Sequence, residues 1–184
     1  HEYLITQIQT SNKLGLDPLT STDTKKNKQI QLDFAHPIKE IVWTLNSKHL
    51  DNTFIYKNMD LSNIISEALL QLNGQDRLEK REGTFYSCIQ PYQFHKSGGL
   101  LEIGSKMYYN GGFYIYSFCL KPDEYQPSSA LNFTSLNNFT INFDYTKTST
   151  AYTTIDEEYT FASYGISYNI LQISKGMAKL VYSS

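Results

Sequence analysis

Short segments in which apolar side chains recur at every second residue are spread along the chain, and this period most constrains its fold. Ile41, Trp43 and Leu45 share one face of such a segment, and we expect Trp43 to lie in the core. Turn-forming residues separate the segments, without an internal repeat or a strand–helix–strand rhythm. About eight short strands joined by turns favour an all-β antiparallel sandwich or barrel. The expected strands are Ile30–Phe34, Ile38–Leu45, Thr53–Tyr56, Phe113–Leu120, Thr140–Tyr145, Tyr164–Ile170 and Met177–Tyr182.

The pattern of apolar residues allows more specific predictions of secondary structure and burial for some segments. Both faces of Phe113–Leu120 are apolar, which predicts a central strand covered on both sides. Residues 140–145 alternate cleanly, which predicts a half-exposed strand. The apolar residues of Asp60–Leu72 fall at helical spacing, with Gly74 as a C-terminal cap, so the pattern alone predicts an amphipathic helix. Two regions stay open: Thr84–Ile89, a short helix or a strand, and Leu100–Tyr109, a strand or an ordered loop.

The 184 residues suit one domain with a core of its own. Polar residues dominate Thr10–Lys28, which predicts a long exposed loop. We therefore expect a single domain over residues 1–184, with a lead-in strand and exposed polar loop over 1–29, the core over 30–184, and short helical turns in the loops. The chain starts at His1 rather than at Met, which suggests a fragment or the later part of a longer chain.

Charge and composition argue against several function classes. Lys and Arg number 16 against 18 Asp and Glu, a net charge of -2, so no basic stripe for direct nucleic-acid binding is expected. The sequence has no run of about 18 apolar residues to predict a transmembrane helix, and no secretory signal opens it. Cys88 and Cys119 are too few for a disulfide framework, so we expect reduced thiols.

The aromatic content is high, with 15 Tyr and 10 Phe. Both residue types favour strands. Tyr is also enriched at protein interfaces, because it buries a large area and keeps a polar tip. The composition therefore fits a β-rich core, either alone or together with extensive subunit contacts.

No pattern in the sequence predicts catalysis. The four histidines, His1, His36, His49 and His95, lack metal-ligand spacing to another ligand residue. Neither a Gly-x-Ser-x-Gly elbow nor a phosphate-binding Gly-Lys-Ser/Thr loop occurs. We expect no enzyme activity, no catalytic residues, no cofactor and no metal.

Four blocks of sequence follow one another over nearly all of residues 36–184. They are Ile38–Trp43; Leu70–Arg77 with Arg81–Tyr86 and Gln90–Gln93; Gly112–Ser128 with Asn132–Thr134; and Tyr168–Leu171 with Gly176–Ala178 and Val181–Ser183. The third block is the most specific, because a strand is followed by Leu-Lys-Pro, two acidic residues, Gln-Pro-Ser and then Asn-Phe. In this order the blocks resemble the major capsid proteins of nucleo-cytoplasmic large DNA viruses. Where the family pattern has His, Gly, Ser-Arg and Asp, this chain has Tyr125, Ser129, Thr134-Ser135 and Asn137.

The resemblance implies a double jelly roll, in which each subunit has two eight-stranded antiparallel sandwiches side by side, and this chain matches the second, C-terminal one. It also implies that three subunits form a pseudo-hexagonal capsomer and that capsomers tile an icosahedral shell. The implied partners are further copies of the chain in a homotrimer, neighbouring capsomers and minor capsid proteins, in a virion capsid assembled in the host cytoplasm. Because the family has a strand at Leu69–Leu72, we expect a short helical turn followed by that strand.

The resemblance also marks two groups of residues as candidate contacts between subunits. Lys121–Ser128 is expected to form an ordered loop near a subunit boundary. Asp76 and Arg77 belong to a family motif inside a charged cluster that reaches Glu82, which predicts either an ion-pair network or a solvated surface. The candidate interface residues are Lys121, Asp123, Glu124, Tyr125, Gln126, Asp76 and Arg77.

Two further functions stay open on sequence alone. A minor capsid or scaffolding relative would share the fold. A carbohydrate-binding jelly-roll module would suit the aromatic content, but it needs an exposed aromatic cluster on a concave sheet face. A cupin-type enzyme needs clustered histidines and carboxylates, which the sequence lacks.

Overall fold

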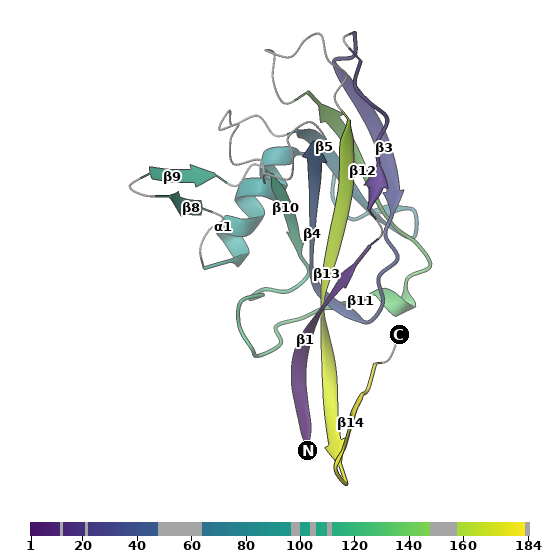
Figure 1. Cartoon of the computed structure of the whole chain (residues 1–184), viewed down its shortest axis with the longest axis vertical. Coiled ribbons are helices and arrows are strands. Elements are labelled where there is room, and N and C mark those ends of the chain that lie inside the picture. Colours follow the sequence, from purple (N-terminus) through teal and green to yellow (C-terminus); the bar gives the residue numbers. More distant parts are fainter. Residues whose placement is uncertain are drawn as a thin grey trace.

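The chain is built mainly of antiparallel β-strands, with a few short helical segments between them (Figure 1). The computed structural model describes residues 1–11, 13–20, 22–47, 64–96, 100–103, 106–109, 112–147 and 158–182. The strands are β1 (Glu2–Thr10), β2 (Leu14–Gly15), β3 (Lys25–Gln31), β4 (Pro37–Ser47), β5 (Ile65–Leu72), β6 (Gln75–Asp76), β7 (Arg81–Glu82), β8 (Leu100–Ile103), β9 (Lys106–Tyr109), β10 (Phe113–Ser117), β11 (Leu131–Asn132), β12 (Phe139–Thr146), β13 (Tyr159–Ser174) and β14 (Met177–Leu180). The helical segments are η1 (Phe85–Ile89), α1 (Gln90–Phe94) and η2 (Phe133–Ser135).

Two sheets form a sandwich. The first follows the order β1-β13-β4-β10, with β2 and β14 paired to β13 and β11 paired to β4. The second follows β3-β12-β5-β6, with β7 paired to β5, while β8 and β9 form a separate hairpin. Spatial neighbours in both main sheets come from distant parts of the sequence, as in a jelly roll. The expected all-β antiparallel fold class is confirmed.

Aromatic side chains from both sheets meet in the core. Trp43 is fully buried, with its ring centroid 5.3 Å from that of Tyr86 and 6.0 Å from that of Tyr114. Phe143 of the second sheet stacks on Phe161 of the first at 5.5 Å between ring centroids. Such rings bury large apolar areas, which is the main stabilising contribution of this core. Trp43 therefore lies in the core, as expected.

The helix expected over Asp60–Leu72 is wrong where the structure describes this segment, because β5 is a strand that pairs with β12. The register of this pair shifts at Ser66, which is an extra residue on β5. The bulge turns Ile65 and Ala68, three residues apart, to the same buried side, and so imitates helical spacing. The strand that the resemblance placed at Leu69–Leu72 is present.

β10 lies at the end of the described first sheet, so the central position expected for Phe113–Leu120 is wrong. It pairs with β4 on one side, and η1 and α1 contact it as well. The Ser117 amide donates a hydrogen bond to Gln90 Oε1 at 3.2 Å, and the Tyr86 ring lies 6.5 Å from that of Tyr116. The helical segments thus cover the edge of β10 and its inner face, whereas Phe113 and Ile115 on the opposite face are only partly buried.

The regions left open by the pattern are now assigned. The segment 84–89 is helical, since η1 runs directly into α1. The segment 100–109 contains the two strands of the β8–β9 hairpin. The short strand expected at 53–56 lies outside the described residues.

The second sheet departs from expectation in two strands. β12 lies between β3 and β5, and its polar residues Thr140 and Asp144 are buried, so it is not half-exposed. The stretch Thr10–Lys28 is not one exposed loop, because it contains β2, buried Leu16 and the start of β3. β3 has a charged sequence, but it gains a full ladder of backbone hydrogen bonds with β12.

β13 is a strand, as expected, but its apolar alternation faces away from the core. The register places Ser163 opposite Trp43 and Gly165 opposite Ile41, so small residues of β13 face the inside. A Cβ at Gly165 would lie 3.1 Å from side-chain atoms of Ile38, which shows how closely the core approaches this strand. The larger residues of the alternation lie on the outer face.

A ribbon of three strands, formed by β1, the end of β13 and β14, extends beyond the sandwich (Figure 1). Lys175 and Gly176 form the tight turn at its tip, both with positive φ, as a type I′ hairpin requires. The same turn geometry at Asn73 and Gly74 joins β5 to β6, so Gly74 is a hairpin residue and not the expected helix cap.

Candidate assembly surface

The loop 118–128 follows β10 and carries most of the predicted interface residues. The Lys121 amide donates a hydrogen bond to Ser128 Oγ at 2.8 Å, which draws the two ends of the loop together. The ammonium of buried Lys39 on β4 donates to the Pro122 carbonyl at 2.7 Å. These contacts fix the loop against the first sheet.

His95, which no sequence motif marked, anchors the same loop. It directly follows α1, and its Nδ1 lies 2.8 Å from Asp123 Oδ1 while its Nε2 lies 2.9 Å from Glu40 Oε2. The other oxygen of Asp123 accepts a hydrogen bond from the Lys96 amide at 2.7 Å. A neutral imidazole has one N–H, whereas an imidazolium donates from both nitrogens. Carboxylates on both sides therefore fit the protonated form of His95.

The charges around His95 reinforce one another. The Glu40 carboxylate raises the pKa of His95 above its ordinary 6.5, and Asp123 adds to this effect, while burial opposes it. Partial burial alone would raise the pKa of Asp123, but the Lys96 amide and His95 outweigh it and hold this pKa below 3.8. Glu40 and Asp123 bind opposite ring nitrogens, so the three side chains form a linear bridge from β4 to the loop.

The outer side of the loop is open to solvent. Tyr125 is 98 % exposed, and Gln126 and Leu120 are also exposed. Lys121 and Glu124 form an ion pair at 3.7 Å whose exposure leaves it little net energy. The loop thus combines an anchored inner side with an exposed outer side that presents an aromatic ring.

Asp76 and Arg77 lie apart from this loop, at the β5–β6 hairpin. Asp76 Oδ1 accepts a hydrogen bond from Gln71 at 2.8 Å, and the Arg77 amide donates to the Leu70 carbonyl at 2.8 Å. Within the described residues, no hydrogen bond or ion pair joins this pair to the loop 118–128. The two predicted groups therefore form separate patches.

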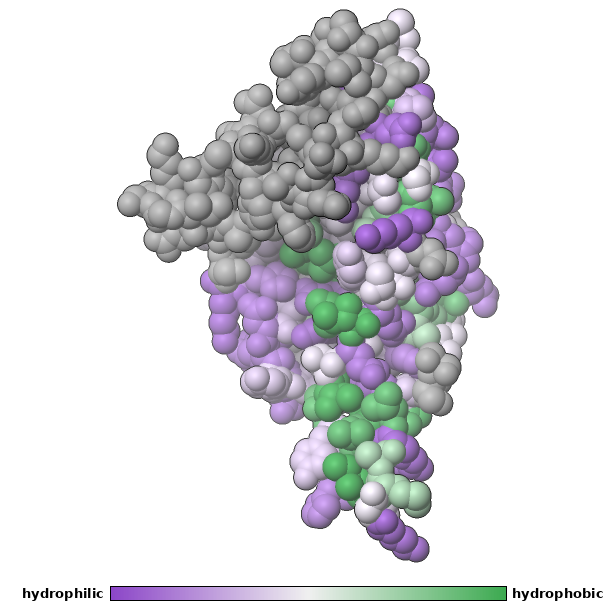
Figure 2. Space-filling view, in the orientation of Figure 1, coloured by the Kyte–Doolittle hydropathy of each residue, from purple (hydrophilic) through white to green (hydrophobic). Residues whose placement is uncertain are grey.

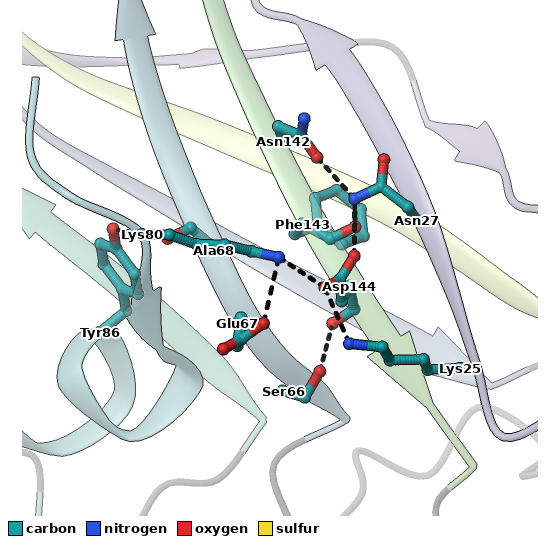
Figure 3. A network of polar contacts seen from close by, with 10 residues as sticks. All are labelled: Lys25, Asn27, Ser66, Glu67, Ala68, Lys80, Tyr86, Asn142, Phe143 and Asp144. Atoms are coloured by element: carbon teal, nitrogen blue, oxygen red, sulfur yellow. Dashed lines mark hydrogen bonds and ion pairs between the residues drawn. The ribbon is translucent and has the colours of Figure 1, made fainter. Parts of the chain in front are cut away.

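A polar network around Asp144 of β12, missed from the sequence, lies on the outer side of the second sheet (Figure 3). Lys80 Nζ lies 2.6 Å from Asp144 Oδ2 and 3.1 Å from Glu67 Oε2. Asn27 donates to Asp144 Oδ1 at 2.6 Å, and Lys25 Nζ lies 3.4 Å from Oδ2 (Figure 3). These contacts connect β3, β12, β5 and the segment before β7.

The network keeps its charges at neutral pH. Burial alone would raise the pKa of Asp144, but Lys80 and Asn27 outweigh it and hold this pKa below 3.8. The carboxylates of Asp144 and Glu67 raise the pKa of Lys80 in turn. Lys80 thus ties the segment before β7 to β5 and β12 through its ion pairs with Glu67 and Asp144.

The ribbon presents exposed apolar side chains over much of its length (Figure 2). Met177 is 73 % exposed and Ile8 is 69 % exposed. Neighbouring residues of a strand point to opposite faces, so the register puts Ile8 and Met177 on one face of the ribbon and Tyr3 and Ile173 on the other. Exposed apolar side chains on both faces fit a segment that another surface covers. We call this surface the apolar ribbon; its residues are Tyr3, Leu4, Ile8, Ile173, Met177, Leu180, Val181 and Tyr182.

Over the described ranges, no group of three or more His, Cys, Asp or Glu side chains is arranged to hold a metal ion. In that same part of the chain, no helix has the length and apolar character needed to cross a membrane. Cys88 and Cys119 are both free, and Cys119 is buried.

Comparison with solved structures places this sandwich among the viral capsid proteins of the jelly-roll class. The sequence profile described as "Large eukaryotic DNA virus major capsid protein" matches residues 1–179. The chain belongs to this family of major capsid proteins, as the resemblance implied.

Individual relatives agree with this assignment. The chain is 30 % identical over 228 residues to the major capsid protein of Paramecium bursaria Chlorella virus 1, covering 100 % of this chain and 49 % of that protein. It is 29 % identical over 202 residues to the major capsid protein of Pyramimonas orientalis virus, covering 100 % and 43 %. A chain of the PBCV-1 virus capsid superposes with a TM-score of 0.77 at 27 % identity, covering 100 % and 52 %. The chain therefore spans about half the length of these relatives.

Proposed function

We propose that the chain is part of a major capsid protein that associates as a homotrimer, and that such trimers are the pseudo-hexagonal capsomers of an icosahedral shell. Neighbouring capsomers and minor capsid proteins are the further partners in this proposal, and the host cytoplasm is the place of assembly. The family match over residues 1–179 and the likeness to a chain of the PBCV-1 virus capsid support it.

The apolar ribbon is the observation that carries the proposal. Exposed apolar side chains lie on both faces of this ribbon, and their contact with water is unfavourable in a protein that stays alone in solution. The ribbon also has unpaired strand edges at β1 and β14 within the described first sheet, and neighbouring subunits are one way to cover such edges. Self-association would bury both features.

The surface gives less support to a carbohydrate-binding module. Sugar stacking needs several aromatic rings together on one sheet face. The most exposed described aromatic residues lie instead on different elements, with Tyr92 on α1, Tyr125 in the loop 118–128, and Tyr3 and Tyr182 in the apolar ribbon. No sheet face in the described strands gathers them.

The mass of the full-length protein in solution, measured by light scattering, tests this proposal. We expect a trimer. Ile8→Asp places a charge on the apolar ribbon and is expected to shift the mass toward the monomer. Leu14→Asp is the matched control, because Leu14 is an exposed apolar residue on β2, outside the ribbon. A wild-type protein that is a stable monomer contradicts the proposal and favours a scaffolding relative or a sugar-binding module.

A further inference from the structure

His95 links three parts of the molecule that are distant in sequence. It follows α1, it contacts Glu40 on β4, and it contacts Asp123 in the loop 118–128. The loop has other attachments, through Lys39 to the Pro122 carbonyl and through the Phe118 amide to the Lys39 carbonyl, and these hold residues 118–122 to β4. Among the described residues, the contacts of Asp123 with His95 and Lys96 are what ties the loop to the end of α1.

Loss of one proton from His95 leaves a single N–H between two carboxylates. The Glu40 side chain is 5 % exposed, and Glu40 Oε2 and His95 Nε2 have no aligned hydrogen bond with any described residue, so their close contact is an attraction between charges. Water reaches Glu40 poorly, and an unpaired buried carboxylate is costly. Deprotonation therefore removes the positive charge that attracts both carboxylates, and the buried Glu40 cannot turn to water in exchange.

The consequence falls on Asp123. The neutral ring no longer attracts Asp123 by charge, and in the tautomer with its proton on Nε2 the lone pair of Nδ1 faces Asp123 Oδ1 at a separation of 2.8 Å, which is repulsive. The Asp123 side chain is 34 % exposed, so it gains water easily when it turns away. The weak side of the bridge is thus the side that holds the loop.

We propose that His95 is a proton-dependent latch, which in its imidazolium form holds the loop 118–128 to the end of α1 and on deprotonation releases Asp123, while Lys39 still holds Pro122 to β4. Because the loop carries the predicted subunit contacts, the effect of the latch on assembly rests on the proposed function. The latch itself rests on the geometry of the bridge.

The other charged groups near the bridge have contacts of their own, so His95 is the group of the bridge that changes its charge in this pH range. Lys39 directs its ammonium to the Pro122 carbonyl and lies 5.8 Å from the Tyr168 ring, whose hydroxyl pKa is raised by burial. On the loop, Lys121 pairs with Glu124. On the His95 side, Lys96 contributes its backbone amide. Since the folded pKa of His95 is raised above 6.5, the latch is fully closed below that pH and opens as the pH rises through the raised value.

Amide hydrogen exchange of the full-length protein, measured by mass spectrometry between about pH 6 and pH 9 and corrected for the intrinsic exchange rate, tests the latch. In the wild type, peptides over 118–128 are expected to exchange roughly 5- to 150-fold faster at the high end, the range typical of coupled sites. H95Q is expected to exchange fast at both ends. H36N is the matched control, because His36 lies outside the bridge and Asn accepts its positive φ.

The double variant E40Q/H95Q covers the case in which H95Q leaves Glu40 unbalanced and unfolds the chain. Its loop is expected to exchange at a rate independent of pH. Loop exchange in the wild type that is flat across this range, or a pH dependence that survives in H95Q or in E40Q/H95Q, overturns the latch. Light scattering of the same samples separates the two proposals, since a protein that is monomeric at every pH contradicts the trimer while the exchange data still decide the latch.

Discussion

The sandwich body and the apolar ribbon share one continuous strand, β13, and differ in what covers it. In the body, Tyr159 and Phe161 are fully buried under the second sheet. Toward the ribbon the second sheet ends, and Ile173 near the end of β13 is exposed although it is equally apolar. The comparison shows that apolar sequence alone does not define the core. The covering layer does, and for the ribbon that layer is absent from the described chain.

The largest effect is expected from Trp43→Ala, because it removes the side chain around which the aromatic core of the body packs. Trp43 contacts Tyr86 and Tyr114 and is fully buried, so the substitution should lower the free energy of unfolding by about 3–5 kcal/mol. Chemical denaturation of the chain measures this. Tyr92→Ala, at an exposed aromatic residue of α1, is the control and should change stability by less than about 0.5 kcal/mol. A loss within about 1 kcal/mol for Trp43→Ala would show that the body lacks the packed core assigned to it.

A smaller effect is expected from Asp144→Asn, which tests whether the outer side of the body is stabilised by charge. The change removes the negative charge that Lys80 and Lys25 contact and should cost about 1–3 kcal/mol at neutral pH. Glu67→Gln is the matched control, since Glu67 contacts the same Lys80 from a more exposed position and should cost less than about 1 kcal/mol.

The pH dependence of this loss identifies its cause. The folded pKa of Asp144 lies below 3.8, so its contribution is present above the unfolded value and disappears as the pH falls through the folded one. The stability difference between wild type and Asp144→Asn should therefore shrink below about pH 4. A difference that is constant from pH 7 down to pH 3 would mean that shape rather than charge matters at this position.

Alternating side chains predicted where β4, β12 and β13 lie, although the alternation of β13 is on the face away from the other sheet. The pattern was misleading where the geometry is irregular. The bulge at Ser66 gave β5 helical spacing. The charged residues of β3 did not predict a strand, because this strand depends on pairing with β12, which lies far away in the sequence.

The candidate site was predictable only in part. The resemblance marked the loop with Lys121, Asp123 and Tyr125, and the structure anchors this loop to the first sheet. His95 and Glu40 carried no local signal, because the register of β4 and the end of α1 bring them together. The role of a lone histidine depends on the carboxylates that the fold places beside it, and the spacing of residues along the chain does not predict which carboxylates these are.

The smallest effect on stability is expected in the apolar ribbon, where the same substitution can be made as in the body. Ile8→Ala removes a side chain that is 69 % exposed and should change the stability of the unassembled chain by less than about 0.5 kcal/mol. Ile41→Ala makes the identical change at a fully buried position and should cost about 2–5 kcal/mol. Denaturation curves of the two variants, recorded at a concentration at which light scattering shows a single chain, measure both. Equal losses would mean that the ribbon is packed like the body and has no surface left for a partner, whereas a loss at Ile8 that grows with protein concentration would show that a second copy covers it.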